Sequence, residues 1–371
     1  MTSGAFSRLQ TAIPRSQEGR IRSRSNPLRL RVLWPQIAAL ACCLVGARAE
    51  ADDGYQLGHG LDLGPLNIAG YSSVSVNLPS QEQKSLALDD LSLFVTGHFN
   101  WLFNPFTEAE LSSLDILRSG HLVGDRGDGD FVLERVYNDS YLTDSITLRL
   151  GKMLTPVGEW NVIHAPPLVL TTVRPAVTYR NFSEYATGAS VLYSDPNTSF
   201  PELQIYAQPV GELSERPASL TVHQYKQVEG AHVSFPLGLL DKIGVSFQQS
   251  KDVHGVDESL YGFDYHYTID KLTLQGEATY SDISNNGTGL VRDTEWGAYA
   301  AASYSLSDQW SAYGWYETFA DRSAPSTAHD VLFGIAYRPH PAIVFKLEYL
   351  QNISGHPVNP TGVFASWSVL F

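Results

Sequence analysis

The last ten residues are Gly362-Val363-Phe364-Ala365-Ser366-Trp367-Ser368-Val369-Leu370-Phe371. In a strand, successive side chains point to opposite faces, so every second residue from Val363 to Phe371 lies on one apolar face. The ends of soluble domains usually fray into polar residues, because an apolar end gains nothing from standing in water. We therefore expect this terminal strand to be buried in an apolar environment.

The first 49 residues have the composition of a secretory signal peptide. They hold eight Arg and one acidic residue, then an apolar run from Ile37 to Ala47 closed by Ala47-Arg48-Ala49. This order predicts cleavage near Ala49, and the apolar run is too short to span a bilayer comfortably. The lead is longer than a signal needs, so a start near Leu28 is an alternative. Two further alternatives for this segment are a mitochondrial transit peptide and lipid attachment at Cys42 or Cys43.

Cleavage leaves residues 50–371, which are strongly acidic. Eight of the 25 Lys and Arg residues and one of the 39 Asp and Glu residues lie in the leader, so 17 bases and 38 acids remain. The resulting net charge of −21 argues against nucleic acid as a partner. Both cysteines are also in the leader, so no disulfide is available and the architecture alone must stabilise the chain.

From residue 66 onward the chain repeats a period-two alternation of apolar and polar residues, as in Val344-Phe345-Lys346-Leu347-Glu348-Tyr349. Sixteen segments have this pattern: 66–78, 87–99, 107–117, 130–140, 145–154, 187–194, 202–209, 229–236, 242–250, 259–268, 271–281, 295–306, 309–319, 330–338, 342–351 and 362–371. The mature part contains no run of 18 apolar residues, so we expect no transmembrane helix.

The connections between these segments alternate between tight turns and long polar loops. An even strand number with that alternation is typical of an outer-membrane barrel, whose sheet closes so that every backbone group is paired. We therefore predict an all-β fold, a transmembrane antiparallel β-barrel of about 16 strands over residues 66–371. Residues 50–65 are its periplasmic lead. A soluble β-sandwich or barrel is the alternative, because its strands would also alternate.

Aromatic residues gather near the ends of the predicted strands. In an outer-membrane barrel, amphipathic rings form girdles at the two membrane interfaces. We expect that role for Trp101, Phe103, Tyr261, Tyr265, Tyr267, Tyr299, Tyr304, Trp310, Tyr313, Trp315, Tyr337 and Tyr349.

The terminal strand resembles the assembly signal of Gram-negative outer-membrane barrels, which has apolar residues at every second position and a final Phe. Here Trp367, Val369 and Phe371 match it. The resemblance implies location in the cell outer membrane, recognition by the barrel-assembly machinery, and contact with outer-membrane lipid and lipopolysaccharide.

The connection 155–186 is too apolar to remain in water, and Pro156, Pro166, Pro167 and Pro175 stiffen it. Its position resembles that of the porin superfamily's third extracellular loop, which folds into the lumen and narrows the pore. The run LRLGKMLTPVGEWN (148–161) is similar to the strand-to-loop segment of phosphate-selective porins. The resemblance implies a long third loop folded into this barrel and, as in most of the superfamily, a homotrimer.

A barrel of about 16 strands is wide enough to leave an aqueous lumen, so we expect passive diffusion of small hydrophilic solutes or ions. The predicted constriction residues are Glu159, His164, Arg174, Arg180 and Glu184. By alternation, the predicted pore-wall residues are Glu108, Glu110, Arg149, Asp264, Glu277, Lys346 and Glu348. Charges on both sides of a narrow gap sort permeants by sign. The alternative is that the loop charges pair with the wall and hold the loop in place.

The sequence gives weaker signals for ion selectivity, metal binding and enzyme activity than for the fold. The chain lacks the ladder of bases that lines phosphate-selective pores, so a mild cation preference is expected. No cofactor or metal site is predicted, because the histidines lack ligand spacing and Asp125–Asp130 departs from a calcium loop. Two alternatives to a channel are an outer-membrane hydrolase, for which His266 and Asp264 are the nearest candidates, and a plugged structural or adhesive barrel. We expect no enzyme activity.

Overall fold

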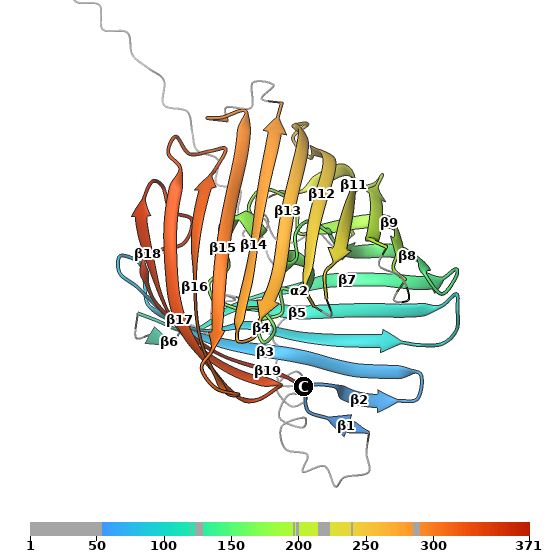
Figure 1. The fold of residues 1–371 in the computed structure, drawn as a ribbon, viewed down its shortest axis with the longest axis horizontal. Helices are drawn as coiled ribbons and strands as arrows, with labels where there is room; N and C mark the ends of the chain where they lie inside the picture. Colours follow the sequence, from blue (N-terminus) through green and yellow to red (C-terminus); the bar gives the residue numbers. More distant parts are fainter. Residues whose placement is uncertain are drawn as a thin grey trace, which may run out of the picture. The chain divides into compact units, whose positions relative to one another are not determined.

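Sixteen long strands form a closed antiparallel barrel (Figure 1). The computed structural model describes residues 54–119, 121–122, 129–195, 197, 200–213, 223–238, 240–284 and 290–371. The barrel strands are β3 (Leu66–Pro79), β4 (Ser85–Gly97), β5 (Asn104–Arg118), β7 (Asp130–Tyr141), β8 (Ile146–Leu154), β9 (Tyr185–Tyr193), β10 (Glu202–Gln208), β11 (Tyr225–Pro236), β12 (Lys242–Asp252), β13 (Asp257–Ile269), β14 (Leu272–Ile283), β15 (Thr294–Ser305), β16 (Trp310–Ala320), β17 (Ala328–His340), β18 (Ile343–Ser354) and β19 (Gly362–Leu370).

The remaining elements are short. Strands β1 (Tyr55–Gln56) and β2 (Gly60–Leu63) precede the barrel, and β6 (His121–Leu122) follows β5. Helix α2 (Trp160–Ile163) and the 3-10 turn η1 (Ala176–Thr178) lie in the connection between β8 and β9. Within the described ranges, no helix has the length and apolar character needed to cross a membrane.

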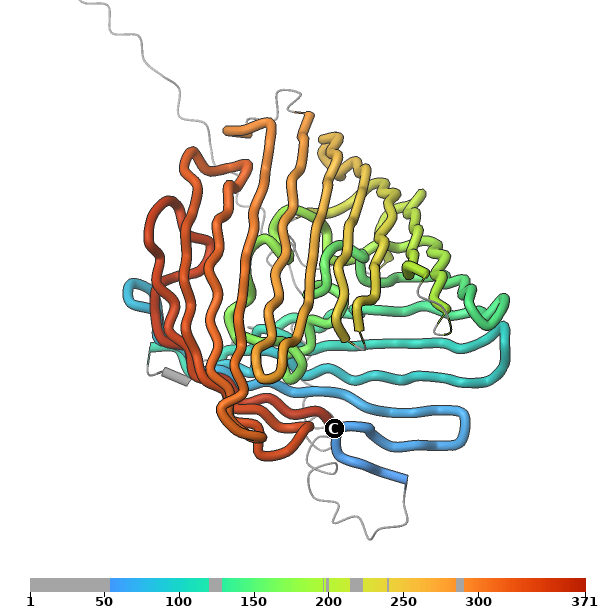
Figure 2. Tube along the Cα trace, viewed as in Figure 1, coloured from blue at the N-terminus to red at the C-terminus, as the bar shows by residue number. Residues whose placement is uncertain are grey.

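The barrel closes where the last strand meets the first long one. β19 pairs antiparallel with β3 along its whole length, for example Trp367 opposite Val74. The pairing ends in two hydrogen bonds, from Gly70 N to Phe371 O at 2.8 Å and from Phe371 N to Gly70 O at 2.9 Å. The traces of β19 and β3 lie side by side in Figure 2. The sheet therefore has no open edge between its first and last long strands.

The predicted segments coincide with observed strands, and the largest difference is at β11, which begins at Tyr225 rather than at residue 229. The lead 50–65 is partly structured, because β2 adds to the edge of β3 with Leu61 opposite Ile68. Asp125–Asp128 and the predicted signal peptide lie outside the described residues.

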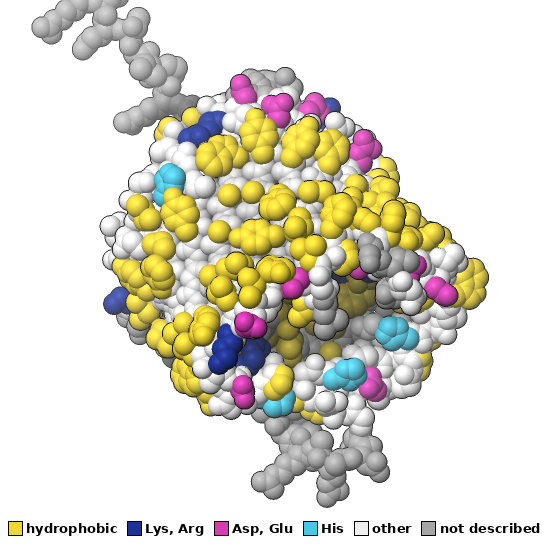
Figure 3. All heavy atoms as spheres, in the orientation of Figure 1, with side chains coloured by type: hydrophobic (Ala, Val, Ile, Leu, Met, Phe, Trp, Pro, Cys, Tyr) yellow, Lys and Arg dark blue, Asp and Glu magenta, His cyan; other side chains and the backbone are white. Residues whose placement is uncertain are grey.

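The two faces of the sheet differ as the alternation predicts. On β18, Phe345, Leu347 and Tyr349 are exposed, whereas the intervening Lys346 and Glu348 are only 4% and 2% exposed. Hydrophobic side chains cover the outward face of the strands turned to the viewer in Figure 3. An apolar outer face and a polar buried face are what a lipid-facing barrel presents.

An aromatic row crosses the outer face of four neighbouring strands. Trp310 stacks on Tyr337 with ring centroids 4.7 Å apart, and Phe345 lies 6.3 Å from Tyr337 and 6.4 Å from Trp367. Trp367, on β19, therefore belongs to the same exposed row. The role of Trp367, Val369 and Phe371 as an assembly signal stays a prediction.

The girdle prediction is wrong for three residues. Tyr299, Tyr313 and Trp315 are buried and belong to an apolar cluster on the inner face. Their positions follow from pairing, because Tyr299 lies opposite Glu317, which is also buried. Position near the end of a predicted strand did not reveal which face of the sheet these side chains occupy.

A charge placed on the exposed face tests whether that face meets lipid. We expect Leu347→Arg to lower the free energy of unfolding in lipid bilayers by about 2–4 kcal/mol, because Leu347 lies in the middle of β18 on the apolar side. Urea titration followed by tryptophan fluorescence measures the change. Asp308→Arg, in the exposed turn between β15 and β16, is the matched control. Equal stability of the two variants would contradict a lipid-facing β18.

Candidate functional site: loop 155–184 and the buried face of the barrel

The long connection between β8 and β9, residues 155–184, is anchored to the buried face of the sheet. Its backbone approaches β14 at Gly158, which has a φ of +69°. A Cβ at this position would overlap the Glu277 carboxylate, so glycine allows both the left-handed conformation and the close approach. The loop can therefore place the next backbone N–H groups on Glu277.

Three buried glutamates, on alternate strands, accept hydrogen bonds from the loop backbone. Glu277 on β14 accepts from Trp160 N at 2.7 Å, and Glu317 on β16 accepts from Val177 N at 2.9 Å. Glu348 on β18 accepts from Thr172 N at 2.6 Å and Val173 N at 3.1 Å. Buried N–H groups need partners, and bonds to carboxylates are stronger than neutral ones. The three carboxylates thus fix the loop at three points.

A buried lysine binds the loop through the opposite polarity. Lys346 Nζ donates to Pro166 O at 2.9 Å and to Val169 O at 2.7 Å. Proline has no N–H, so the carbonyl groups are what this part of the loop offers. Lys346 and Glu348 therefore bind neighbouring stretches of the loop from one strand.

Apolar contacts strengthen this attachment. Trp160 and Val177 of the loop are buried in one cluster with Tyr299, Tyr313 and Trp315 of the sheet. The rings of Trp160 and Tyr299 meet edge to face with centroids 6.1 Å apart. Burying large aromatic side chains contributes a few kcal/mol each, so the loop has its own small core.

Two of the predicted constriction residues, Glu159 and His164, pair with the barrel strands. Glu159 lies 3.2 Å from Lys242 Nζ on β12 and 3.6 Å from His266 Nδ1 on β13. His164 Nε2 lies 3.2 Å from Glu134 Oε2 on β7. At both positions the loop charge pairs with the barrel wall, as the alternative interpretation expected. The part of Glu159 and His164 in conduction stays a prediction.

Arg174 and Glu184 pair with each other inside the loop. Arg174 also donates from Nε to Thr178 Oγ1 at 2.9 Å, so its guanidinium is fixed within the loop. Arg180 pairs at 3.1 Å with Asp321, in the connection between β16 and β17. The structure thus gives every predicted constriction residue an oppositely charged or titratable partner.

His223, just before β11, connects a second loop to this network. Its Nε2 lies 2.7 Å from the carbonyl oxygen of Arg180. Burial lowers the pKa of His223 to about 3, and the nearby Arg322 adds to that effect. Burial raises the pKa of Asp321, but hydrogen bonds from Ser323 and Arg180 outweigh it and lower the value overall. His223 is therefore a neutral donor to the Arg180 carbonyl.

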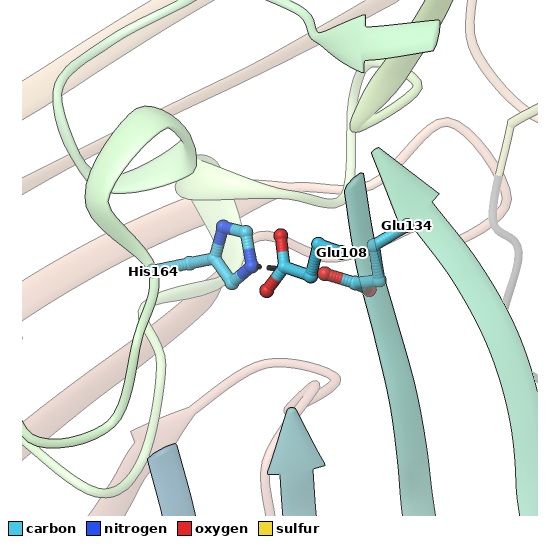
Figure 4. Close-up of side chains that lie close together, drawn as sticks. All are labelled: Glu108, Glu134 and His164. Carbon is cyan, nitrogen blue, oxygen red and sulfur yellow. Dashed lines mark hydrogen bonds and ion pairs between the residues drawn. The ribbon is translucent and has the colours of Figure 1, made fainter. Parts of the chain in front are cut away.

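Glu108, Glu134 and His164 come together from β5, β7 and the loop (Figure 4). One ligand-type atom from each lies within 4.8 Å of the other two. Glu108 also pairs with Arg135, and burial lowers the pKa of His164. The sequence predicted no metal site, yet these three residue types are ones that bind metals. This group is the nearest approach to a metal centre found among the described residues.

The predicted wall residues lie on the buried face. Glu108, Glu110, Asp264, Glu277, Lys346 and Glu348 are all buried. Arg149 is partly exposed and makes a two-pronged pair with Asp139, with both N···O distances 2.8 Å. His266 and Asp264, the candidate hydrolase pair, have other neighbours: His266 lies near Glu159, and Asp264 lies 3.9 Å from His232. Whether the wall residues touch a conduction path stays a prediction.

Two loop-binding residues were missed by the sequence analysis. Glu317 follows the same alternation as Tyr313 and Trp315, so the period of its strand could have placed it on the inner face. Glu134 is the extra residue of a bulge, because Glu108 pairs with Arg135 while Ala109 pairs with Leu133. A bulge redirects a side chain, and only pairing across strands reveals it.

Comparison with known proteins places this geometry in a recognised fold. No family model matches the chain. An uncharacterized protein of Aquifex aeolicus is 22% identical over 377 residues, which cover 88% of this chain and 82% of that protein.

Three solved structures share the fold. The trimer form of OmpT from Vibrio cholerae is 12% identical, with a TM-score of 0.58, over 84% of this chain and all of that one. The anion-selective porin of Comamonas acidovorans is 14% identical, with a TM-score of 0.56, over 82% and 98%. Salmonella typhi OmpF, in complex with daunomycin, is 12% identical, with a TM-score of 0.61, over 82% and 97%. The chain therefore shares its 16-stranded barrel fold with these three proteins.

The His223 contact makes the stability of the barrel depend on pH. The pKa of His223 is depressed to about 3 in the folded chain and is about 6.5 in an unfolded one. The unfolded chain therefore binds the extra proton between these values, and stability falls as pH drops through that window. At pH 5 the loss is about 2 kcal/mol relative to pH 7.5.

Urea unfolding at the two pH values measures this loss of stability. In His223→Gln the difference in unfolding free energy between pH 7.5 and pH 5 should be smaller by about 2 kcal/mol. His254→Gln, in an exposed turn, is the matched control and should keep the full wild-type dependence. An unchanged pH dependence in His223→Gln would contradict a buried, neutral His223.

Proposed function

We propose that the protein is an outer-membrane porin, a water-filled channel for passive diffusion of small hydrophilic solutes or ions, narrowed by loop 155–184. The observation that carries the proposal is the attachment of one long loop to buried carboxylates on three separate strands, Glu277, Glu317 and Glu348. In a barrel whose interior is filled by side chains alone, a surface loop would not reach buried carboxylates on the inner face. The porin-type fold is consistent with the proposal and does not by itself carry a function.

The partly exposed charges support a role in sorting ions. Five paired side chains retain between 18% and 33% of their accessible surface: Glu159, Arg174, Arg180, Glu184 and Lys242. Paired charges that still reach water create a local field without the full cost of burying an isolated charge. Acids outnumber bases in the chain, so we propose that the channel prefers cations. We also propose that it has no enzyme activity, because His266 and Asp264, the nearest hydrolase candidates, face other partners.

Planar-bilayer recording with a salt gradient tests the channel. The wild-type protein should give stepwise conductance, with a reversal potential of the sign expected for cation preference. Silence, in protein shown to be folded by heat-modifiable gel mobility, would overturn the channel and bring a plugged barrel or an enzyme forward. An open channel with the opposite sign would overturn only the selectivity.

Loop variants extend the same recording. The combined change Glu277→Gln, Glu317→Gln and Glu348→Gln replaces charge-assisted hydrogen bonds with neutral ones, so the loop should be released part of the time. We expect larger or noisier conductance steps. Glu229→Gln, an exposed acid on β11, is the matched control and should leave the steps unchanged. Unchanged steps in the triple variant would contradict a constriction made by this loop.

We further propose that the protein forms a homotrimer through the outer face of β4 and β5. Leu91 lies opposite Leu111 and Leu88 lies opposite Leu114 on that face, so it is aliphatic. The exposed aromatic row lies elsewhere, on β16 to β19. Exposed rings border this face, with Phe99, Trp101 and Phe103 in the β4–β5 turn and Phe131 opposite Leu111. The aliphatic patch between them suits a packed subunit interface.

Unheated gel mobility and analytical ultracentrifugation in detergent measure the assembly. The wild type should sediment at three times the chain mass, and Leu91→Arg combined with Leu111→Arg should sediment as a monomer, because four like charges per pair of subunits cannot be buried. Leu347→Arg, on the outer face of β18 and separated from β4 by β19 and β3, should remain a trimer. A wild-type monomer, or a trimer in both variants, would contradict this interface.

A further inference from the structure

The group of Glu108, Glu134 and His164 brings one nitrogen and two carboxylate ligands together from three separate elements (Figure 4). Glu108 and Glu134 are fully buried, and the His164 side chain retains 16% of its accessible surface. The group is therefore rigid on the barrel side and reachable from the loop side. Its three donor atoms lie within 4.8 Å of one another.

The hydrogen bonds of His164 leave a ligand nitrogen facing a carboxylate. His164 Nδ1 lies 3.0 Å from the carbonyl oxygen of Asn161, which can only accept, so Nδ1 carries the ring hydrogen and donates it. Nε2 is therefore the ring nitrogen that faces the carboxylate, 3.2 Å from Glu134 Oε2. With Nδ1 carrying the ring hydrogen, the Nε2 lone pair is the one that can bind a metal ion in place of a proton.

The distance between these two atoms fits a shared metal ion. Zinc binds imidazole nitrogen and carboxylate oxygen at about 2.0–2.2 Å, so neighbouring ligands of a tetrahedral ion lie about 3.3 Å apart. The His164–Glu134 distance of 3.2 Å already has that value. Of the three ligands, Glu108 is the one that has to move closer, and a water molecule would supply the fourth.

Surrounding groups orient the ligands in the manner of an outer shell. Asn161 O holds the His164 ring, the Tyr185 hydroxyl donates to the other oxygen of Glu134, and Ser92 Oγ donates to Glu108 at 3.0 Å. Metal-binding histidines and carboxylates in proteins are supported by contacts of these kinds. His164 and Glu134 are therefore oriented without the metal, and Glu108 is held within 4.8 Å of them.

The charge of the surroundings favours a cation. Ser92 and Tyr71 place Glu110 beside Glu108, with distances of 3.2 and 3.1 Å to Glu110 Oε2. Three buried carboxyl groups, those of Glu108, Glu110 and Glu134, thus surround the site, and Arg135 pairs with Glu108. Imidazole together with carboxylate suits zinc and its transition-metal neighbours better than magnesium or calcium.

We propose that Glu108, Glu134 and His164 bind a divalent transition-metal ion of the zinc class, which joins loop 155–184 to the β5–β7 wall. The site does not rest on the proposed channel function, because the ligands come together whether or not the barrel conducts. A bound ion would fix the start of the loop to the side of the barrel away from Glu277, Glu317 and Glu348.

Calorimetric titration with zinc chloride tests the site in full-length protein refolded in detergent and stripped with a chelator. The wild type should bind one more zinc ion per chain than His164→Ala or Glu134→Gln, or bind it at least tenfold more tightly. Magnesium chloride should give no such difference. His266→Ala is the matched control. His266 also faces a carboxylate, Glu159, but no third ligand joins them among the residues that the structure describes, so this variant should bind zinc as the wild type does.

Equal zinc binding by the wild type and His164→Ala would overturn the site. Heat-modifiable gel mobility shows whether each variant has folded, and Glu108 is left unchanged because it also pairs with Arg135. Zinc-edge X-ray absorption of the loaded wild type is the second measurement. It should report one imidazole and oxygen ligands at about 2.0–2.2 Å. A spectrum without imidazole would overturn the site even if every variant misfolds.

Discussion

Every long strand of this protein depends on pairing between β3 and β19. A sheet whose outer face is apolar cannot leave a row of N–H and C=O groups open at its edge, since in an apolar medium each unpaired group costs several kcal/mol. The hydrogen bonds between Gly70 and Phe371 complete the ring of sixteen strands. Closure makes one face of the sheet an outside and the other an inside, and all later features follow from that separation.

The inside is polar, and the polar groups are used to hold a loop. Glu277, Glu317 and Glu348 would be costly to bury alone, and backbone N–H groups of the loop would be costly to bury without acceptors. Each set supplies what the other lacks, and Lys346 does the same for loop carbonyl groups. A loop fixed by such contacts has few conformations, as the proposed constriction of the channel requires.

Much of the fold could be predicted because period-two alternation is a local property. The strand that ends at Phe371, the even strand number and the alternation of short and long connections were all legible in the residues themselves. Local pattern also placed Glu277, Lys346 and Glu348 on the inner face, and their burial confirms that face. It failed for Tyr299, Tyr313 and Trp315, where a position near the end of a predicted strand was taken as a sign of the outer surface.

The sequence by itself determined the class of fold, the inner and outer faces of most strands, and the segment that forms the long loop. Only the tertiary structure decided which charges meet. Glu134 reaches His164 because a bulge in β7 turns it inward, and Glu159 meets Lys242 and His266 across the ring of strands. The physical reason is that strand identity depends on neighbours in sequence, whereas contacts across the barrel depend on the register of every strand between them.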